Sequence, residues 1–73
     1  MIEIYGKINC NYCTSAVDLC KTLKLDYKYY HLDQDYTLTQ LWDKVKFKTF
    51  PQVFVDGVCI GGFSELLEFT NGS

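Results

Sequence analysis

Two stretches in the first half of the chain have the residue pattern of β-strands. In Ile2–Tyr5 apolar residues alternate with other side chains until Gly6 ends the run, and Tyr27–Leu32 is dense in aromatic residues. Between them, apolar residues recur along Cys13–Lys24 at the spacing of one helix face. Because a helical crossover between two strands of a sheet makes those strands parallel, the pattern predicts a parallel β-α-β unit.

The second half begins with the pattern of another helix. Thr37 and Gln40 have the spacing of a capping box, in which each side chain accepts a hydrogen bond from the other residue's backbone N–H. Apolar residues continue at helical spacing as far as Val45, which predicts an amphipathic helix. Positive charge suits the end of a helix. Three lysines follow there: Lys44, Lys46 and Lys48.

A hairpin and a last helix are predicted to complete the fold. Val53–Val55 and Val58–Ile60 flank Asp56-Gly57, a pair that favours a tight turn between antiparallel strands. Ser64 is placed to cap a short helix over Glu65–Thr70, because a serine hydroxyl can accept a hydrogen bond from the first turn.

The predicted elements follow one another in the order β-α-β-α-β-β-α, and residues 71–73 are expected to form a frayed tail. A parallel β-α-β unit followed by an antiparallel hairpin makes a mixed four-stranded sheet with helices on its faces. We therefore expect a single α/β domain over residues 1–73, with the thioredoxin-like fold in its smallest form.

Composition and charge narrow the function. The chain has 73 residues, a net charge of −2 and no arginine, which argues against a nucleic-acid partner because phosphate binding needs a basic face. No apolar run approaches the roughly 20 residues of a membrane span. No secretory signal pattern opens the sequence, so we expect a cytoplasmic protein whose four cysteines are reactive or buried rather than a disulfide framework.

Cys10 and Cys13 are the strongest candidates for chemistry. They are separated by two residues and lie between the first predicted strand and the first predicted helix. A thiol at a helix N-terminus ionises more readily, because unpaired N–H groups and the helix dipole stabilise the negative charge. Cys10 is therefore the expected nucleophile, and Lys7 adds positive charge nearby. Cys13 then resolves the mixed disulfide by attacking the Cys10 sulfur.

Two other interpretations of this pair are half of a zinc site and two unreactive core thiols. A structural zinc site needs a second pair of ligands, and Cys20, His31 and Cys59 are not spaced to supply one, so no metal site is expected. Cys20 lies on the apolar stripe of the first helix and is expected to be buried. Cys59 is expected to be structural, and His31 to lie on the surface or in the core. The aromatic residues expected in the core or on the sheet faces are Trp42, Tyr27, Tyr29 and Tyr30.

Three segments resemble signatures of the glutaredoxin family, in the family's order and over essentially the whole chain. They are Lys7-Ile8-Asn9-Cys10-Asn11-Tyr12-Cys13, which is similar to the Lys-x-x-Cys-Pro-Tyr-Cys active site; Thr49-Phe50-Pro51-Gln52-Val53-Phe54-Val55, which is similar to the Thr-Val-Pro-Gln loop with its cis proline; and Gly61-Gly62-Phe63-Ser64-Glu65-Leu66, which is similar to the Gly-Gly-x-x-Asp-Leu glutathione-binding turn. The chain departs from these patterns at Asn11, Phe50 and Glu65, where Pro, Val and Asp are usual.

The resemblance implies a glutathione-dependent thiol–disulfide oxidoreductase that reduces protein disulfides and glutathione mixed disulfides. It implies a cis bond before Pro51, although proline at the start of a strand is also ordinary. The backbone of Phe50 would pair with the cysteinyl part of glutathione as an added strand does. Gly62, Phe63 and Ser64 would form the turn that binds the γ-glutamyl carboxylate at a helix N-terminus. The same turn also fits a simple helix cap.

Three more residues are candidates for contacts with glutathione. The resemblance makes Lys7 and Lys48 candidates for binding the glycine carboxylate. Tyr12 projects from the active-site loop and is expected to pack on the bound peptide. Lys44 and Lys46 are interpreted instead as a solvated helix face.

The resemblance leaves two competing functions open. Some glutaredoxins hold a [2Fe–2S] cluster between two subunits through the nucleophilic cysteine and glutathione, and the absence of proline at position 11 favours this function. A redoxin coupled to thioredoxin reductase would share the fold and the cysteine pair but lack a glutathione groove, and the Gly61–Ser64 turn argues against it. In the main interpretation glutathione is a co-substrate and not a tightly bound cofactor, the protein is a monomer, and ribonucleotide reductase is a candidate electron acceptor.

Overall fold

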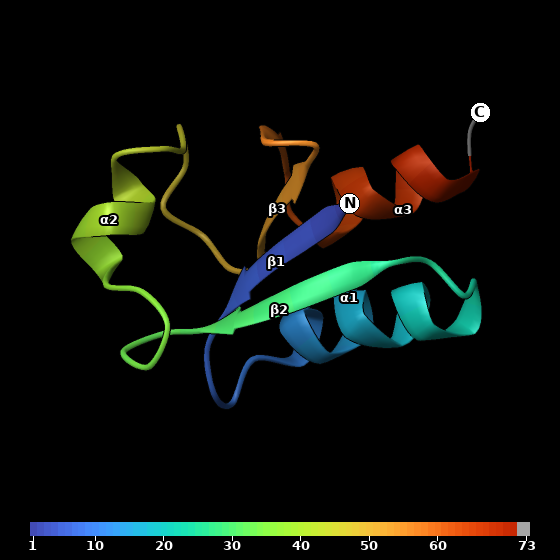
Figure 1. Ribbon diagram of the computed structural model, residues 1–73, viewed down its shortest axis with the longest axis horizontal. Helices are drawn as coiled ribbons and strands as arrows, with labels where there is room; N and C mark the ends of the chain where they lie inside the picture. The colour runs from blue at the N-terminus through green and yellow to red at the C-terminus, as the bar shows by residue number, and fades with distance from the viewer. Residues whose placement is uncertain (72–73) are drawn as a thin grey trace.

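The computed structural model describes residues 1–71, in which the predicted order of strands and helices is confirmed (Figure 1). The elements are β1 (Ile2–Gly6), α1 (Asn11–Thr22), β2 (Tyr27–His31), α2 (Leu38–Trp42), β3 (Gln52–Val55), β4 (Val58–Gly61) and α3 (Phe63–Asn71). Gly72 and Ser73, part of the predicted tail, lie outside the described residues, while residue 71 is the last residue of α3.

The strands form one four-stranded sheet in the order β2-β1-β3-β4. β1 pairs with β2 in parallel, so that Ile4 lies beside Tyr29, and pairs with β3 in the antiparallel sense, so that Ile4 also lies beside Val53. β3 and β4 are the predicted antiparallel hairpin. The mixed sheet that the sequence predicts is therefore confirmed, and β1 lies in its interior, where it carries the chain directly into the loop before α1.

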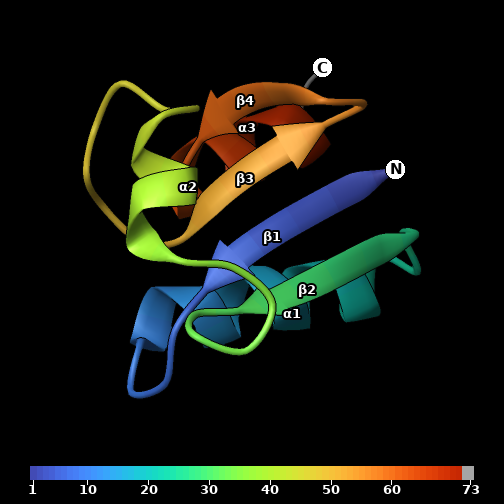
Figure 2. The same cartoon turned by 60° about the vertical axis from the view of Figure 1, so that its left-hand side comes forward.

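One face of the sheet is covered by α1 and α3, and the other by α2 (Figure 2). The core on the first face consists of buried residues from β1, β3 and both helices: Ile2, Ile4, Ala16, Cys20, Val53 and Leu66. Cys20 is fully buried, as predicted, and burial raises the pKa of its thiol. The first helix is thus anchored to the sheet beneath its whole length, which gives its N-terminus a defined position.

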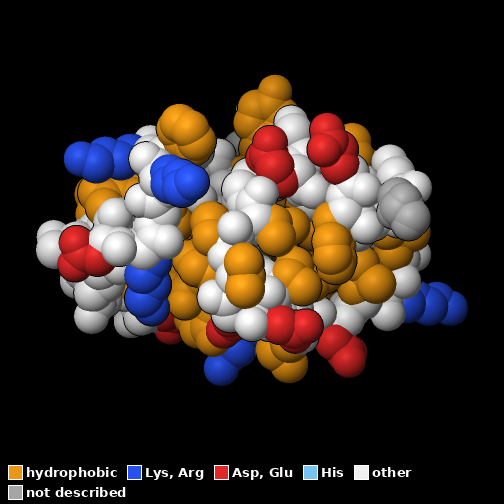
Figure 3. All heavy atoms as spheres, turned by 90° about the horizontal axis from the view of Figure 1, so that it is seen from above, with side chains coloured by type: hydrophobic (Ala, Val, Ile, Leu, Met, Phe, Trp, Pro, Cys, Tyr) orange, Lys and Arg blue, Asp and Glu red, His pale blue; other side chains and the backbone are white. Residues whose placement is uncertain are grey.

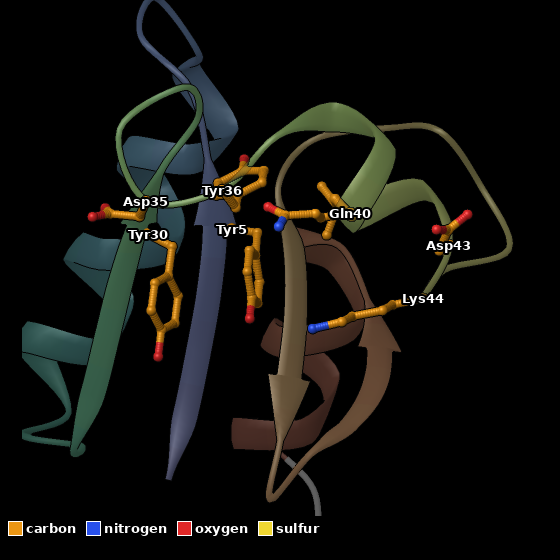
Figure 4. A pocket seen from close by; sticks show the side chains of 8 residues that line it. Tyr5, Tyr30, Asp35, Tyr36, Gln40, Asp43 and Lys44 are labelled. Carbon is orange, nitrogen blue, oxygen red and sulfur yellow. The ribbon is translucent and has the colours of Figure 1, made fainter.

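The α2 face is built mainly from aromatic side chains. Tyr5 stacks on Tyr30 with ring centroids 4.7 Å apart, and it makes edge-to-face contacts with the rings of Tyr36 and Phe54. α2 covers only part of this face and leaves a hollow of about 460 Å³ beside the cluster (Figure 4). The Tyr36 hydroxyl donates a hydrogen bond of 2.7 Å to the carbonyl of Gly6, and burial raises the pKa of this tyrosine.

The second helix is shorter than predicted, because α2 ends at Trp42 and not at Val45. Its start is as expected, since both hydrogen bonds of the Thr37–Gln40 capping box are present. Of its residues only Leu41 is fully buried, so few tertiary contacts support a longer helix. The lysines predicted at its end lie instead on an exposed loop: Lys44, Lys46 and Lys48.

The buried side chain of Gln52 fixes the conformation of the loop that follows α2. The Gln52 amide nitrogen donates hydrogen bonds of 2.6 Å to the carbonyl of Phe47 and 2.8 Å to the carbonyl of Thr49. Those carbonyls therefore accept hydrogen bonds from a side chain of β3 and not from the backbone N–H groups of a longer helix. Seen from above, hydrophobic side chains gather across the middle of the molecule, and lysine side chains are prominent at its α2 end (Figure 3).

The start of α1 agrees with the sequence prediction, whereas the start of α3 differs from it. α1 begins at Asn11, so Cys10 lies at the helix N-terminus as expected. α3 begins at Phe63, so the prediction that Ser64 caps it is wrong. The carboxylate of Glu65 caps the helix start instead, since it accepts a hydrogen bond of 2.7 Å from the N–H of Gly62.

No helix among residues 1–71 is long and apolar enough to span a bilayer. Over the same residues, no group of three or more His, Cys, Asp and Glu side chains is arranged to hold a metal ion.

Candidate active site

Cys10 and Cys13 form a disulfide at the N-terminus of α1, with their Cα atoms 5.2 Å apart. Cys13 is only 1% exposed, whereas Cys10 is half-buried and is the more accessible of the two sulfurs. This order of exposure fits the roles predicted for Cys10 as the nucleophile and for Cys13 as the resolving thiol. An attacking thiolate must reach a substrate in solvent, and a resolving thiol needs only to reach its neighbour.

Cys10 is also the N-cap residue of α1. The backbone N–H of Cys13 points at the Cys10 sulfur, with 3.2 Å between nitrogen and sulfur, and the Cys10 carbonyl accepts a hydrogen bond of 3.2 Å from Thr14. The sulfur therefore takes the acceptor position that a serine or aspartate oxygen usually occupies at a helix start. In the reduced protein this N–H and the helix dipole both favour the ionised sulfur.

The loop before Cys10 contains a turn that the sequence analysis did not identify. Asn9 has a φ of 56°, in the left-handed region that asparagine tolerates better than most residues. The Asn9-Cys10 junction thereby turns the chain from the end of β1 into α1. Asparagine within a polar loop was the only available signal, and it does not by itself specify a left-handed residue.

The Phe50–Pro51 peptide bond is cis, as the family resemblance implies. Pro51 is fully buried, and it directly precedes β3. A Cβ atom on Gly62 would lie 3.2 Å from the Pro51 carbonyl oxygen, so the Gly62 turn can approach the proline loop only because it has no side chain.

These segments enclose a hollow of about 190 Å³ that contains most of the predicted glutathione-binding residues. It is lined by Tyr12, Thr49, Phe50, Pro51, Gly62, Phe63, Ser64 and Glu65. The rings of Tyr12 and Phe63 stack across it with centroids 6.0 Å apart. Sequence analysis did not include Thr49 or Glu65 among the binding residues, although both lie within the motifs it identified. We call this space the proline hollow.

The two predicted lysines take different positions. The Nζ of Lys7 lies 5.2 Å from the centroid of the Phe50 ring, which places a positive charge at the border of the proline hollow. Lys48 is exposed on the loop that leads to Thr49 and does not line the hollow. Neither lysine lines the hollow itself, but the Lys7 ammonium lies over the ring of Phe50, which does line it.

The start of α3 has the electrostatic features of a carboxylate site. The N–H groups of Phe63 and Ser64 belong to the first turn of the helix, where no intrahelical acceptor is available. The Glu65 carboxylate already accepts a hydrogen bond from the N–H of Gly62 at this helix start. A second carboxylate arriving at this helix start would therefore meet two favourable donors and one repulsive negative charge.

The remaining cysteine and histidine side chains lie outside this arrangement. His31 is exposed, with its ring 4.6 Å from that of Tyr29. Cys59 is half-buried, and its thiol lies 3.5 Å from the side-chain oxygen of Gln52. These contacts fit the structural and surface roles expected from the sequence. The aromatic residues expected to pack on the sheet do so: Tyr27 and Tyr29 on the α1 face, Tyr30 and Trp42 on the α2 face.

The sheet order, the flanking helices and a disulfide-forming Cys-x-x-Cys pair at a helix start define a thioredoxin-like protein. Comparison with known proteins narrows this class. The model of the glutaredoxin family matches residues 2–60, so the chain belongs to the glutaredoxin family.

Individual relatives agree with this assignment. The chain is 32% identical over 68 residues to mitochondrial glutaredoxin-2 of Bos taurus and 34% identical over 70 residues to glutaredoxin 1 of Escherichia coli K12. These matches cover 88% and 85% of this chain. The chain spans only 43% of the length of the mitochondrial relative, but 82% of the bacterial one.

Solved structures show the same fold. The buckwheat glutaredoxin–glutathione complex superposes with a TM-score of 0.83 at 27% identity, covering 94% of this chain and 66% of that one. Reduced glutaredoxin from Escherichia coli superposes with a TM-score of 0.80 at 30% identity, covering 94% and 91% of the two chains.

Proposed function

We propose that the protein is a glutathione-dependent thiol–disulfide oxidoreductase that reduces protein disulfides and mixed disulfides of glutathione. The observation that carries this proposal is the Cys10–Cys13 disulfide at the start of α1, beside the hollow formed by the Pro51 loop and the Gly62 turn. Membership of the glutaredoxin family supports the same chemistry, and one structural neighbour was solved as a complex with glutathione.

In the first half of the reaction the Cys10 thiolate attacks one sulfur of a substrate disulfide. The substrate S–S bond breaks, and the departing sulfur takes up a proton. Cys13 then loses its proton and attacks the Cys10 sulfur, which releases the second substrate thiol and leaves the Cys10–Cys13 disulfide. The substrate has gained two electrons, and the cysteine pair has lost them.

Glutathione returns the pair to the dithiol. One glutathione thiolate attacks the Cys10 sulfur and frees Cys13 as a thiol. A second glutathione thiolate attacks the glutathione sulfur held on Cys10, which forms glutathione disulfide and restores the Cys10 thiolate. The N–H of Cys13 stabilises the departing Cys10 sulfur in this last step, because it already points at that atom in the disulfide form.

The proline hollow is our proposed place for glutathione. The backbone of Phe50 would pair with the cysteinyl part, as an added strand pairs with a sheet. The γ-glutamyl carboxylate would accept hydrogen bonds from the N–H groups at the start of α3, at Phe63 and Ser64. Tyr12 would pack on the peptide, and Lys7 and Lys48 would supply positive charge for the glycine carboxylate. Lys7 has the stronger support, because it already lies over Phe50.

Several finer points complete the proposal. Glutathione is a co-substrate and not a tightly bound cofactor, the protein acts as a monomer in a reducing cytoplasm, and ribonucleotide reductase is one electron acceptor. They are supported by the family resemblance and by the cysteine usage. A brown dimer with visible absorbance, bleached on oxidation, would favour the alternative role of a [2Fe–2S] carrier.

The proposal is tested by glutathione-coupled reduction of a small glutathione mixed disulfide. Cys10→Ser should abolish turnover, because the other sulfur at the helix start, that of Cys13, is buried and cannot reach a substrate in solvent. Cys13→Ser should keep this activity, since that reaction needs only one thiol, but should lose the reduction of protein disulfides.

Cys59→Ser is the matched control, because Cys59 lies on β4 away from the helix start and should keep both activities. Full activity in Cys10→Ser would contradict the mechanism. Equal loss in Cys10→Ser and Cys13→Ser would contradict the one-thiol step.

A further inference from the structure

A second hollow adjoins the redox pair, on the side away from the proline hollow. It has a volume of about 420 Å³ and is lined by Lys7, Ile8, Cys13, Thr14, Val17, Asp18, Lys21, Tyr29 and His31. None of these residues lines the proline hollow. Because the sheet order is β2-β1-β3-β4, this second hollow opens toward β2, whereas the proline hollow opens toward β3. We call it the β2-side hollow.

The β2-side hollow combines an apolar surface with a positive charge. Ile8 is 80% exposed at its border, and Val17 is half-buried in its wall. Its charged side chains are Lys7 and Lys21 against the single carboxylate of Asp18. Over residues 1–71 the only salt bridge joins the N-terminal amine to a different aspartate, so these lysines have no carboxylate partner within the described chain. Their charge is available to an incoming group.

The place of Cys13 in this hollow connects it to the reaction. Cys13 is nearly fully buried, yet it lines the β2-side hollow and is absent from the proline hollow. The polypeptide that is joined to Cys10 in the mixed disulfide must continue away from the sulfur on one side or the other. With about 420 Å³ against about 190 Å³, the β2-side hollow is the larger space next to the pair.

We propose that the β2-side hollow receives the polypeptide segment next to the reacting cysteine of a protein disulfide, and that it prefers segments carrying acidic side chains beside apolar ones. This inference rests on the proposed exchange between the Cys10–Cys13 pair and protein disulfides. In that exchange the Cys10 sulfur joins one substrate sulfur while the substrate S–S bond breaks. Cys13 then closes the disulfide, and two electrons pass to the substrate. The hollow holds the substrate chain between these two steps.

Charge complementarity gives this preference its direction. A Glu or Asp next to the substrate cysteine would lie near Lys7 and Lys21 and would be attracted, whereas a Lys or Arg would be repelled. Because the lysines are exposed, the attraction is modest, and it should weaken as salt shortens the distance over which charges act. We expect selection among protein substrates rather than tight binding.

The test uses a single turnover without glutathione. The protein is fully reduced, separated from reductant and mixed with one of two cyclic peptide disulfides. The peptides are identical except that one has Glu, and the other Lys, on both sides of one cysteine. Formation of the Cys10–Cys13 disulfide is followed by acid quench, alkylation and mass spectrometry. Hydroxyethyl disulfide, which is small and uncharged, reports whether the pair itself is intact.

The parent should react faster with the Glu peptide by about threefold to tenfold at low salt, a range that corresponds to two partly screened ion pairs. Lys21→Glu should lower the ratio of the rate with the Glu peptide to the rate with the Lys peptide to one or below, and Lys21→Gln should give an intermediate ratio. Asp18→Asn should raise the rate with the Glu peptide about twofold. Hydroxyethyl disulfide should react equally with every variant.

Lys28→Glu is the matched control. It makes the same change in net charge, but the Lys28 Nζ lies over the Tyr30 ring on the α2 face of the sheet, opposite α1. The ratio of the two peptide rates for Lys28→Glu should equal that of the parent. Equal rates of the parent with both peptides, or equal effects of Lys21→Glu and Lys28→Glu, would overturn the inference. Because no glutathione is present, loss of glutathione-linked turnover would count against the proposed function alone.

Discussion

Two helices pack on one face of the sheet, and the core between them and the sheet contains six buried residues. On the other face the five-residue helix α2 packs over a core of three buried residues. The first face carries the cysteine pair at the start of α1 and the Gly62 turn at the start of α3. The second is largely aromatic and leaves a hollow of about 460 Å³ open beside Tyr5 and Tyr30. This chain therefore concentrates its packing behind the cysteine pair.

The reason is geometric. A nucleophile at a helix start must be held in one position relative to the substrate, and packing beneath the whole helix provides that. Ala16 and Cys20 bury the α1 stripe against β1, and Leu66 does the same for α3. The α2 face has to stabilise the sheet but does not position a reacting atom. A chain of 73 residues has little surface to bury, so a short helix suffices there.

The largest expected effect compares the two cores directly. Leu66→Ala should lower the free energy of unfolding by about 2–5 kcal/mol, because it leaves a cavity between α3 and the sheet. Leu41→Ala removes the same atoms on the α2 face and should cost about 2 kcal/mol, since the neighbouring hollow already reduces its packing. Urea unfolding measures both. A larger loss for Leu41→Ala would reverse the comparison.

Tyr36→Phe should be the next largest change. It removes a buried hydrogen bond to the Gly6 carbonyl and should cost about 1–3 kcal/mol. Because burial raises the pKa of Tyr36 in the folded state, its contribution is complete below pH 10 and declines as the pH rises above the unfolded value of 10.0. The parent should therefore lose stability above pH 10 more steeply than the variant in urea titrations.

The same variant also tests whether the two faces act separately. Its initial rate of mixed-disulfide reduction at neutral pH should match that of the parent, because Tyr36 contacts the end of β1 and not the cysteine pair. A loss of rate greater than the loss of folded protein would show that the α2 face does position the redox loop.

Gly62→Ala should weaken glutathione use with little change in stability. The added Cβ would press on the Pro51 carbonyl at 3.2 Å and narrow the proline hollow. We expect the KM for glutathione to rise about tenfold, equivalent to about 1.4 kcal/mol, with kcat nearly unchanged. Gly57→Ala is the control, because Gly57 has a φ of +86° on the hairpin and its Cβ would meet nothing within 4 Å. It should cost about 1 kcal/mol of stability and leave KM unchanged.

Glu65→Gln should produce the smallest effect. The amide oxygen can still accept the hydrogen bond from Gly62, but the negative charge at the start of α3 is gone. A glutathione carboxylate at this helix start would then meet less repulsion, so the KM for glutathione should fall about twofold to threefold at low salt. An unchanged KM would place the carboxylate elsewhere, whereas the tenfold effect of Gly62→Ala would still stand.

Local sequence patterns were reliable where neighbouring residues decide the structure. The Thr37–Gln40 capping box, the Asp56-Gly57 turn and the alternation in β1 all involve contacts over a few residues, and the structure contains each of them. The end of α2 and the cap of α3 were predicted wrongly. In both places a side chain competes for backbone groups: Gln52 takes the carbonyls of the loop after α2, and Glu65 takes the N–H that precedes α3.

The order of the elements, the cysteine pair at a helix start and three motifs of one family could all be predicted from the sequence, because they depend on residue spacing along the chain. The residues that line each hollow are set by packing in three dimensions. This packing brings Tyr12, Pro51 and Gly62 to one side of the redox pair and Lys21 to the other. Those neighbours are set by the sheet order and by how closely the helices pack, and no local pattern encodes either.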